Sequence, residues 1–418
     1  MAVRNDALRL SDAWRTHLDL GSLLEHQLGN RDVMSADFDV VAIGKASREM
    51  ASVTAQFLGD RVNRTFIVSA GDVGDEPSPS TTVVVGEHPI PGLGSLEAGR
   101  RLVEFLERPS DATCTLFLVS GGASSLCTLP EAPLNLDDLA TIWAGALASG
   151  VNITALNQLR AATSQIAGGA ILRRVRTSRS SALIMVDNVV SGASWVASGL
   201  TYEYQPSLDE VQQMIDECGL RDSDVESRIV LAFGARTEYM RTTTNLVHQN
   251  VVIAEPSMVL SNTIEEARRL GYRVLDLGAT IQGNVAEVAE LIDRTLRAAL
   301  AASDRICVVG VGEATVRVAG DGAGGRCQEL AWLMAERLSH FDREVVFVAR
   351  ATDGQDFLLG VGGAWVDSLT MAKCSKFGIE WEHVAASNDS FHGLRALGQL
   401  LKGEHTGWNL CDLYLALA

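Results

Sequence analysis

The chain has 418 residues, and its 52 acidic residues against 35 basic ones give it a net charge of −17. Hydrophobic residues make up 47% of the sequence, so the chain can build a large core and intrinsic disorder is not expected. Such an acidic surface repels phosphate backbones and anionic lipid, which argues against nucleic acids and membrane surfaces as partners.

Apolar β-branched runs alternate with segments of helical periodicity along the whole chain. The predicted strands are, in chain order, 38–43, 65–69, 82–85, 115–119, 182–186, 251–254, 272–277, 306–310, 315–319 and 344–348. The predicted helices are 96–106, 136–148, 155–174, 208–217, 286–301 and 328–338. Several strands are apolar throughout, which is typical of strands that are covered on both faces. The alternation predicts an α/β protein with mostly parallel sheets.

The length predicts two domains, because single domains usually hold about 100 to 200 residues. The most polar stretch is 202–228, and it suggests a boundary between an N-terminal α/β domain over 1–225 and a C-terminal α/β domain over 226–418. Ligands of open α/β sheets bind at the carboxyl ends of the strands. The loops that follow predicted strands are therefore the candidate sites.

The cellular compartment is predicted from three features. No apolar run approaches the roughly 20 residues that span a bilayer. The first residues lack the apolar stretch of a secretory signal. Seven widely spaced cysteines without a CxxC pair favour reduced thiols rather than a disulfide framework or a zinc site. A cytoplasmic protein is expected.

Two loops of the first half combine the features of an anion site. Lys45 follows the predicted strand 38–43 and precedes a short helical segment, so its ammonium lies beside the free N–H groups of a helix N-terminus. Only four of the 35 basic residues are Lys, and Lys45 is the sole Lys in the first 372 residues. The loop Ser120–Ser125 offers successive N–H groups and hydroxyls for a phosphate or carboxylate, although a tight turn that needs glycine for backbone reasons is an equal alternative.

A glycine-rich loop and an acidic loop follow in the second half. Gly320, Gly322 and Gly325 fit the GxGxxG spacing of dinucleotide sites. Arg326 at the helix start suits a bidentate clamp on phosphate or carboxylate, and the acidic residue that dinucleotide sites carry about 20 positions later is missing. Beyond the strand 344–348, the carboxylates at positions 353 and 356 suit Mg²⁺ held through water, or an Asx turn or helix cap.

Taken together and in order, eight motifs resemble the glycerate 2-kinases of the MOFRL family, whose members are sometimes labelled hydroxypyruvate reductases. The motifs are IGKAS (43–47), EHPIP (87–91), LVSGGASSL (118–126), SGLT (198–201), GEATVRVAGDGAGGRCQELA (312–331), ATDGQD (351–356), SNDS (387–390) and TGWN (406–409). The resemblance implies two Rossmann-like α/β domains with a cleft between them, and transfer of phosphate from ATP, with Mg²⁺, to a hydroxyl of glycerate. A small hydroxy acid and a nucleotide are the implied partners, and a homodimer is one of the assemblies left open.

The resemblance also implies roles for single residues. The implied catalytic residues are Lys45, Asp187 and Arg326. Lys45 and Arg326 would neutralise charge on the phosphoryl group or the substrate carboxylate, and Asp187 would orient or deprotonate the acceptor hydroxyl. Substrate or phosphate contacts are expected at His88, Ser120, Gly121, Gly122, Ser124, Glu313 and Gly325. Nucleotide contacts are expected at Asp353, Asp356 and Asn409, and Mg²⁺ ligands at Asp353 and Asp187. Taken alone, His88 reads more simply as a structural histidine.

The chain departs from the family inside these motifs. Where members read KHLSxxKGGR, residues 161–170 read AATSQIAGGA, so one His, two Lys and one Arg become Ala. Cys327 replaces the Asn of GGRNQE, and Phe357, Leu358 and Leu359 replace small and polar residues. Three alternatives stay open: a diverged member with a larger or more apolar acceptor, a binder of nucleotide or metabolite without catalysis, and, least favoured, an NAD(P)-dependent hydroxypyruvate reductase.

Overall fold

The computed structural model describes residues 2–29, 36–71, 79–149, 151, 153–188, 192–301, 305–404 and 406–418. The chain forms two compact units. The parallel-sheet unit comprises Leu20–Val186 and Val190–Ile253, and the mixed-sheet unit comprises Met1–Asp19, Asp187–Val189 and Ala254–Ala418. The predicted boundary between 225 and 226 falls inside the parallel-sheet unit, at the start of helix α10 (Glu226–Met240).

The parallel-sheet unit is built on six strands in the order β3-β2-β1-β4-β5-β6. The ladders that join β3, β2, β1, β4 and β5 are all parallel. The strands are β1 (Phe38–Ile43), β2 (Val62–Ala70), β3 (Thr81–Gly86), β4 (Cys114–Val119), β5 (Arg179–Met185) and β6 (Val247–Ala254). The central strands β1 and β4 are buried at every residue, as strands covered on both faces should be.

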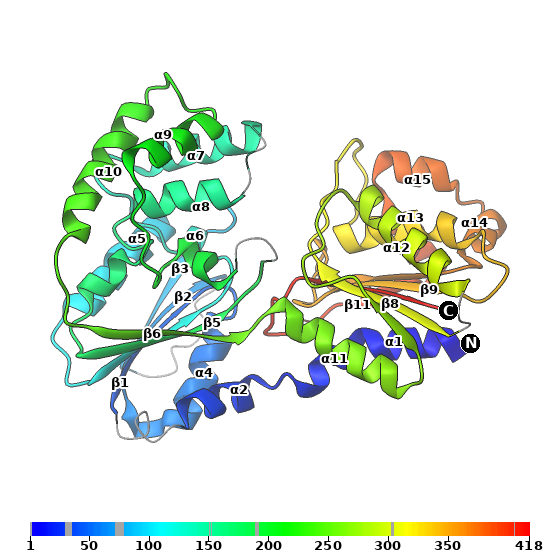
Figure 1. Ribbon diagram of the computed structural model, residues 1–418, viewed down its shortest axis with the longest axis horizontal. Helices are drawn as coiled ribbons and strands as arrows, with labels where there is room; N and C mark the ends of the chain where they lie inside the picture. Colours follow the sequence, from blue (N-terminus) through cyan, green and yellow to red (C-terminus); the bar gives the residue numbers. More distant parts are fainter. Residues whose placement is uncertain are drawn as a thin grey trace. The chain divides into compact units, whose positions relative to one another are not determined.

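Helices α4 and α5 cover the sheet of this unit, and α7 to α10 gather beyond one end of it (Figure 1). The helices are α2 (Leu20–Leu28), α4 (Ser47–Leu58), α5 (Leu93–Glu107), α6 (Ala123–Leu126), α7 (Leu136–Ser149), α8 (Ile153–Ala162), α9 (Leu208–Glu217) and α10 (Glu226–Met240). The helices α7 to α10 bury a core cluster of their own, which includes Ile142, Leu159, Ile215 and Ile229. This helical layer therefore has its own apolar packing.

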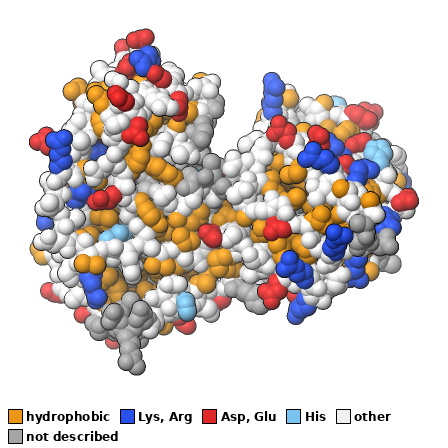
Figure 2. Space-filling view, in the orientation of Figure 1, with side chains coloured by type: hydrophobic (Ala, Val, Ile, Leu, Met, Phe, Trp, Pro, Cys, Tyr) orange, Lys and Arg blue, Asp and Glu red, His pale blue; other side chains and the backbone are white. Residues whose placement is uncertain are grey.

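One face of the parallel-sheet unit leaves apolar side chains in solvent. Val247 of the edge strand β6 is 67% exposed, and Leu231 of α10 is 63% exposed. Figure 2 shows apolar side chains gathered on the visible face of this unit, with acidic and basic side chains interspersed around them. β6 is the last strand of the sheet order, so one of its sides has no neighbouring strand in this sheet.

The α/β prediction is confirmed, with one parallel sheet and, in the second unit, a mixed sheet. Its six strands run in the order β11-β10-β9-β12-β8-β7, and only β7 and β8 are parallel. The strands are β7 (Arg273–Asp276), β8 (Ile306–Gly312), β9 (Val346–Ala351), β10 (Val361–Asp367), β11 (Leu400–Lys402) and β12 (Asp412–Leu417). The loop 352–360 between β9 and β10 is too short for the crossover that a parallel pair requires, so these strands pair antiparallel.

Seven helices among the described residues complete the mixed-sheet unit. They are α1 (Ala2–Ala13), α11 (Pro256–Arg269), α12 (Val285–Leu300), α13 (Arg326–Leu338), α14 (Thr370–Phe377), α15 (Trp381–Ser387) and α16 (Ser390–Leu397). The N-terminal helix α1 belongs to this unit because Asp6 accepts a hydrogen bond from the Tyr272 hydroxyl (2.8 Å) and Asp12 pairs with Arg350 (2.8 Å). None of the helices in the described part of the chain is long and apolar enough to cross a bilayer.

Two predicted elements are wrong in part. Residues 315–319 do not form a strand: only Thr315 makes an isolated bridge, and Val318 is 73% exposed because no neighbouring strand covers it. The helix predicted over 155–174 ends at Ala162. Gly168 and Gly169 have φ angles of 56° and 75°, a left-handed backbone that no α-helix can contain.

Arg236 on α10 fixes this glycine turn from behind. It is 1% exposed, and its guanidinium donates to the carbonyls of Ser164, Ala167, Gly168 and Tyr204 at 2.9–3.3 Å. Burial lowers the pKa of Arg236 to about 10, yet the group stays charged at neutral pH. Within the described residues no carboxylate forms an ion pair with Arg236, so carbonyl dipoles are its direct partners.

We therefore expect Arg236→Met to lower the free energy of unfolding by about 3 kcal/mol, because it leaves several buried carbonyls without a donor. Chemical denaturation of both proteins measures the difference. The matched control is Arg241→Met, an exposed arginine near the end of the same helix, which should change stability very little. Equal stability of the Arg236 variant and the unmodified chain would contradict this account of the turn.

Candidate active site

The loops after β1 and β4 touch each other at the carboxyl end of the parallel sheet. Ser120 accepts a hydrogen bond from the Ala46 N–H through its hydroxyl (3.1 Å), and the Lys45 N–H donates to the Gly121 carbonyl (2.9 Å). Gly44 has a φ of 125°, and a Cβ there would lie 2.3 Å from the Ser120 hydroxyl oxygen. Only glycine allows this close approach, so the IGKAS and SGGASS loops are fixed as one structure.

Lys45 projects from this joined loop into solvent. Its side chain is exposed, and no carboxylate lies within ion-pair distance of it among the described residues. The N–H groups of Gly121 to Ser124 donate to no carbonyl in the described part of the chain. An unpaired ammonium beside several free N–H groups attracts an anion.

His88 lies beside the same group. The loop that carries it is held by Glu87, whose carboxylate accepts from the N–H groups of Gly94 and Ser95 at the start of α5 (3.1 and 2.8 Å). A Cβ on Gly122 would lie 3.1 Å from the His88 ring, which places the ring against the glycine loop. Desolvation of the ring and the charge of Lys45 lower the pKa of His88 to about 4. The imidazole is therefore neutral at pH 7.

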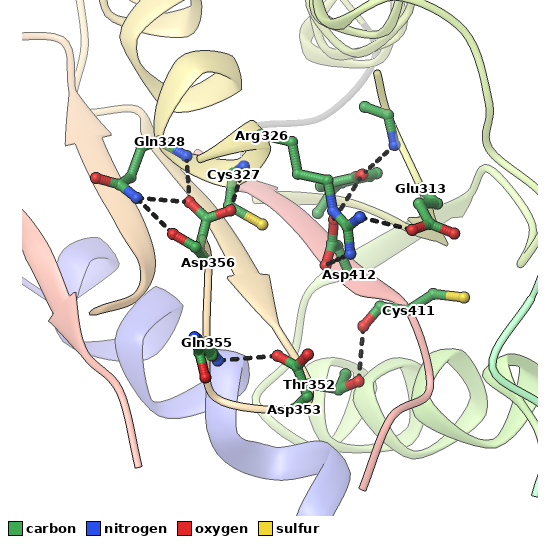
Figure 3. A network of polar contacts seen from close by, with 12 residues as sticks. Glu313, Arg326, Cys327, Gln328, Thr352, Asp353, Gln355, Asp356, Cys411 and Asp412 are labelled. Atoms are coloured by element: carbon green, nitrogen blue, oxygen red, sulfur yellow. Dashed lines mark hydrogen bonds and ion pairs between the residues drawn. The ribbon is translucent and has the colours of Figure 1, made fainter. Parts of the chain in front are cut away.

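In the mixed-sheet unit, Arg326 is the centre of a cluster of charges (Figure 3). It begins α13, donates twice to Asp412 (2.6 and 3.2 Å) and once to Glu313 (2.6 Å). Its side chain is one-third exposed, while Asp412 is buried. The bidentate pair fixes the plane of the guanidinium, and the N–H bonds that remain can still donate to another group.

Burial raises the pKa of Asp412 to about 6; Arg326 opposes this rise, and the neighbouring carboxylates Asp356 and Glu313 add to it. One cation thus faces three carboxylates, and the protonation of Asp412 changes within a moderately acidic range. Sequence reasoning did not single out Asp412, because a carboxylate at the first residue of a strand gives no signal without knowledge of its partner.

Asp356 acts as a cap for α13 from a distant loop. Its carboxylate accepts from the backbone N–H groups of Cys327 and Gln328 (3.1 and 2.9 Å) and from the Gln328 side chain (2.9 Å). A Cβ on Gly325 would lie 2.3 Å from this carboxylate, which explains the glycine at that position. Asp356 is buried and its oxygens are occupied, so its contacts correspond to the helix-cap alternative.

Asp353 and Asn409 lie on two loops that are tied to each other. The Thr352 hydroxyl donates to the Cys411 carbonyl (2.7 Å), and the Thr406 hydroxyl donates to the Thr352 carbonyl (2.6 Å). Asp353 accepts from the Gln355 N–H (2.8 Å), which is the Asx turn that the sequence also allowed. Its side chain stays half-buried.

Asp187 comes two residues after strand β5, but its contacts are with the loop that carries Asn409 and Cys411. Its carboxylate accepts from the Asn409 side chain (3.2 Å), and its carbonyl accepts from the Cys411 thiol (3.3 Å). The compact units accordingly place Asp187 with the mixed-sheet unit. Members of the resembled family read SDVxGD where residues 186–191 read VDNVVS, so Ser191 stands in place of the second Asp, and residue 191 lies outside the described residues.

The glycine spacing that fits a dinucleotide site has a packing explanation. A Cβ on Gly320 or Gly322 would lie 2.5–2.6 Å from the Ser387 carbonyl oxygen. The Asn388 side chain accepts from the Gly320 N–H (3.3 Å), and Asp389 accepts from the Ala323 N–H (2.9 Å). The glycines are needed because the SNDS segment packs directly on this loop, so their spacing does not by itself indicate a dinucleotide.

The predicted residues therefore form one group in each unit. The group in the parallel-sheet unit consists of Lys45, His88, Ser120, Gly121, Gly122 and Ser124. The group in the mixed-sheet unit consists of Asp187, Glu313, Gly325, Arg326, Asp353, Asp356 and Asn409. The first offers positive charge and N–H donors, and the second offers an oriented arginine among carboxylates. Together they define a two-unit α/β protein with polar loops suited to anionic ligands.

The comparison with known proteins identifies its family. A profile described as "Domain of unknown function (DUF4147)" matches residues 11–232, and that of the MOFRL family matches residues 306–412. Because the first match covers more than half of the chain, the chain belongs to the DUF4147 family, with a MOFRL region in its second half. The family resemblance of the eight motifs is confirmed.

Several similar proteins are glycerate kinases by name. The D-glycerate 2-kinase of Thermotoga maritima is 26% identical, with 90% of each chain covered. The glycerate 2-kinase of Pyrococcus horikoshii is 27% identical over 99% of this chain and 95% of that protein. A crystal structure of the Thermotoga maritima glycerate kinase matches with a TM-score of 0.85 at 23% identity, covering 99% of this chain and 98% of that one. The fold is therefore shared along nearly the whole chain.

The raised pKa of Asp412 predicts a pH dependence of stability. The folded state holds this proton more tightly than the unfolded chain, so the stabilisation is fully present below pH 4 and is lost as the pH rises through about 6. Relative to Asp412→Asn, the free energy of unfolding of the unmodified chain should fall by about 1.4 kcal/mol per pH unit between those values.

Denaturation curves at several pH values measure this slope. The control is Asp342→Asn, an exposed loop carboxylate whose variant should follow the unmodified chain at every pH. If the free energies of unfolding of Asp412→Asn and of the unmodified chain change equally with pH, Asp412 is ionised over this whole pH range and the account is contradicted.

Proposed function

We propose that this chain is a kinase that transfers the terminal phosphoryl group of ATP to a hydroxyl of glycerate or a related small hydroxy acid. Family membership and the named relatives support the reaction class. The observation that carries the proposal is the unpaired, exposed ammonium of Lys45 beside the free N–H groups of the Gly121–Ser124 loop. Phosphoryl transfer needs positioned positive charge more than covalent chemistry, and this loop supplies it.

Lys45 has the role of stabilising negative charge on the transferring phosphoryl group. Gly121 accepts from the Lys45 N–H and Ser120 accepts from the Ala46 N–H, so the backbone that carries the ammonium is fixed before the ligand arrives. His88 is neutral at pH 7 and lies against the same glycine loop, where it can donate or accept a hydrogen bond without adding charge. A site of this kind costs little reorganisation during reaction.

Arg326 is the second cation of the proposal. Asp412 and Glu313 fix its guanidinium, and the donors that remain suit a phosphate or carboxylate oxygen. Asp187 is the candidate for orienting or deprotonating the acceptor hydroxyl. During transfer the bond from the γ-phosphorus to its bridging oxygen breaks, a bond to the acceptor oxygen forms, and the hydroxyl proton leaves to a base such as this carboxylate.

Mg²⁺ is the implied metal, and the chemistry of the residues fits it. Among the described residues no group of three or more His, Cys, Asp or Glu converges into a metal site. This ion usually takes one or two carboxylates together with substrate phosphates, and Asp353 and Asp187 are the candidates to hold it. When bound, it would neutralise phosphate charge. We assign Asp356 to the cap of α13 rather than to the nucleotide.

The alternatives rank below this proposal. A dehydrogenase rested on the GxGxxG spacing, which packing against Ser387 explains. A changed acceptor keeps support from the alanines at 161, 162, 167 and 170, and from Phe357 and Leu359, which are 75% and 88% exposed. All seven cysteines are buried free thiols, and a reducing, cytoplasmic compartment is part of the proposal.

The test is a coupled assay that measures ADP release with ATP, Mg²⁺ and D-glycerate. Lys45→Ala should lower the turnover number by about 100- to 1,000-fold, because one preorganised charge is lost from the transition state. Lys45→Arg should restore little, since a planar guanidinium does not reproduce a compact ammonium.

The matched control is Lys376→Ala, an exposed lysine at the end of α14, which should keep full activity. If the unmodified chain phosphorylates no small hydroxy acid, the proposed function fails. If Lys45→Ala keeps the full rate, the reaction class survives but the role of Lys45 does not.

A further inference from the structure

The hydroxyl of Tyr414 lies beside Asp412 inside the core of the mixed-sheet unit. Both residues are on β12, two positions apart, so their side chains project from the same face of the strand. Tyr414 is 1% exposed and belongs to the core cluster that includes Trp332 and Phe347. A hydroxyl in such apolar surroundings requires hydrogen-bond partners, because leaving it without them is unfavourable.

Two partners fix the direction of the hydroxyl proton. The Ala314 N–H donates to the Tyr414 hydroxyl oxygen (3.0 Å). A backbone N–H can only donate, so the hydroxyl gives its own proton to the other partner, the Asp412 carboxylate (3.4 Å). Burial and the charge of Asp412 raise the pKa of Tyr414, so the hydroxyl keeps this proton. Tyr414 therefore links the loop after β8 to the carboxylate that holds Arg326.

These hydrogen bonds belong to a closed network. Asp412 accepts from Arg326 twice (2.6 and 3.2 Å), and Arg326 also donates to Glu313 (2.6 Å). Glu313 directly precedes Ala314, where the network began. Figure 3 shows Arg326 between Asp412 and Glu313. Because the network is closed, the guanidinium cannot turn away from one partner without straining the bonds to the others.

The closed network leaves part of Arg326 available. Its hydrogen bonds use one N–H each of Nε, Nη1 and Nη2. A guanidinium carries a pair of N–H bonds on each terminal nitrogen, so one on Nη1 and one on Nη2 remain. The side chain is one-third exposed. The orientation that Asp412 and Glu313 impose therefore decides how the remaining donors meet an anion from outside the chain.

Tyr272 provides a comparison within the same unit. It is 5% exposed, and its hydroxyl donates to Asp6 (2.8 Å), which also pairs with Arg305 (3.4 Å). The same three chemical groups thus meet here, a phenol, a carboxylate and a guanidinium. They lie where β7 and β8 begin, whereas Glu313 follows the end of β8. This second group joins α1 to the sheet and includes none of the candidate site residues.

We infer that Tyr414 is a positioning residue for the proposed phosphoryl transfer: through Asp412, its buried hydroxyl holds Arg326 in the orientation in which the remaining donors meet an anionic ligand. Tyr414 acts on the ligand only through Arg326. Donors that are fixed in advance need no reorganisation during the reaction, so a more mobile guanidinium lowers the rate. This inference rests on the proposed function and adds a residue to the same site.

The kinetic test is a double-mutant cycle in the coupled assay with ATP, Mg²⁺ and D-glycerate. Tyr414→Phe removes only the hydroxyl and should lower kcat/KM by about 10- to 100-fold, the loss expected when a reacting group is misplaced. In an Arg326→Lys background the same change should lower it by no more than about twofold, because the group that Tyr414 positions is already gone. An equal loss in both backgrounds, or no loss in either, would overturn the inference.

The matched control is Tyr272→Phe, which removes a hydroxyl from a bond to a carboxylate in the same unit. It should leave kcat and KM unchanged in both backgrounds, even where it lowers the melting temperature. If Tyr414→Phe does not fold, Asp412→Asn takes its place, because an amide cannot accept both hydrogen bonds from Arg326.

A second measurement does not depend on activity. In the chain labelled with ¹⁵N-arginine, NMR follows the exchange of the Arg326 Nε–H with water, and the loss of the signal in Arg326→Lys assigns it. Tyr414→Phe should speed this exchange by about 3- to 10-fold, the effect of weakening one hydrogen bond, and Tyr272→Phe should not change it. If the unmodified chain phosphorylates no hydroxy acid, the proposed function fails, and the exchange alone decides whether Tyr414 positions Arg326: faster exchange supports it, and unchanged exchange overturns it.

Discussion

The contact between Gly44 and Ser120 is the constraint on which the parallel-sheet half of the site depends. Two adjacent parallel strands end at the same edge, and their loops approach so closely that a Cβ on Gly44 would overlap the Ser120 hydroxyl. This contact fixes the backbone of Lys45 and the turn of the glycine loop at the same time. The position of the ammonium and the free N–H groups beside it then follow from one local structure.

The mixed-sheet half depends on carboxylates from distant parts of the chain. They accept hydrogen bonds from the first N–H groups of α13 and from the guanidinium of Arg326. Asp356 caps α13, and Asp412 orients Arg326 on the first turn of the same helix. Both carboxylates are buried, so each depends on its partner to stay there. The guanidinium of Arg326 is thereby held in one orientation, and the charge of its partner Asp412 depends on pH.

The sequence could predict those features that depend on local order. Strands at 38–43 and 115–119, the helix at 208–217 and the loops that follow strands all come from periodicity within short windows. The order of strands in the mixed sheet could not be predicted, because the last strand, β12, inserts between β8 and β9 from far along the chain. Helix α1 likewise packs with residues far along the chain: it begins the sequence but belongs to the unit that contains Ala254–Ala418.

The same distinction applies to the site. Lys45 and Arg326 stand out by residue type and position, and both lie in polar loop groups. The glycines at 320 and 322 could not be interpreted from spacing, because their reason is a carbonyl contributed by Ser387.

The central claim is that the chain binds a nucleotide and a small hydroxy acid for phosphoryl transfer, and one calorimetric experiment tests it most directly. ATP with Mg²⁺ is titrated into the unmodified chain, first alone and then in the presence of D-glycerate. The account predicts saturable nucleotide binding that the acid strengthens. Absence of nucleotide binding under both conditions would contradict it, because a kinase that cannot bind its phosphate donor has no reaction to perform.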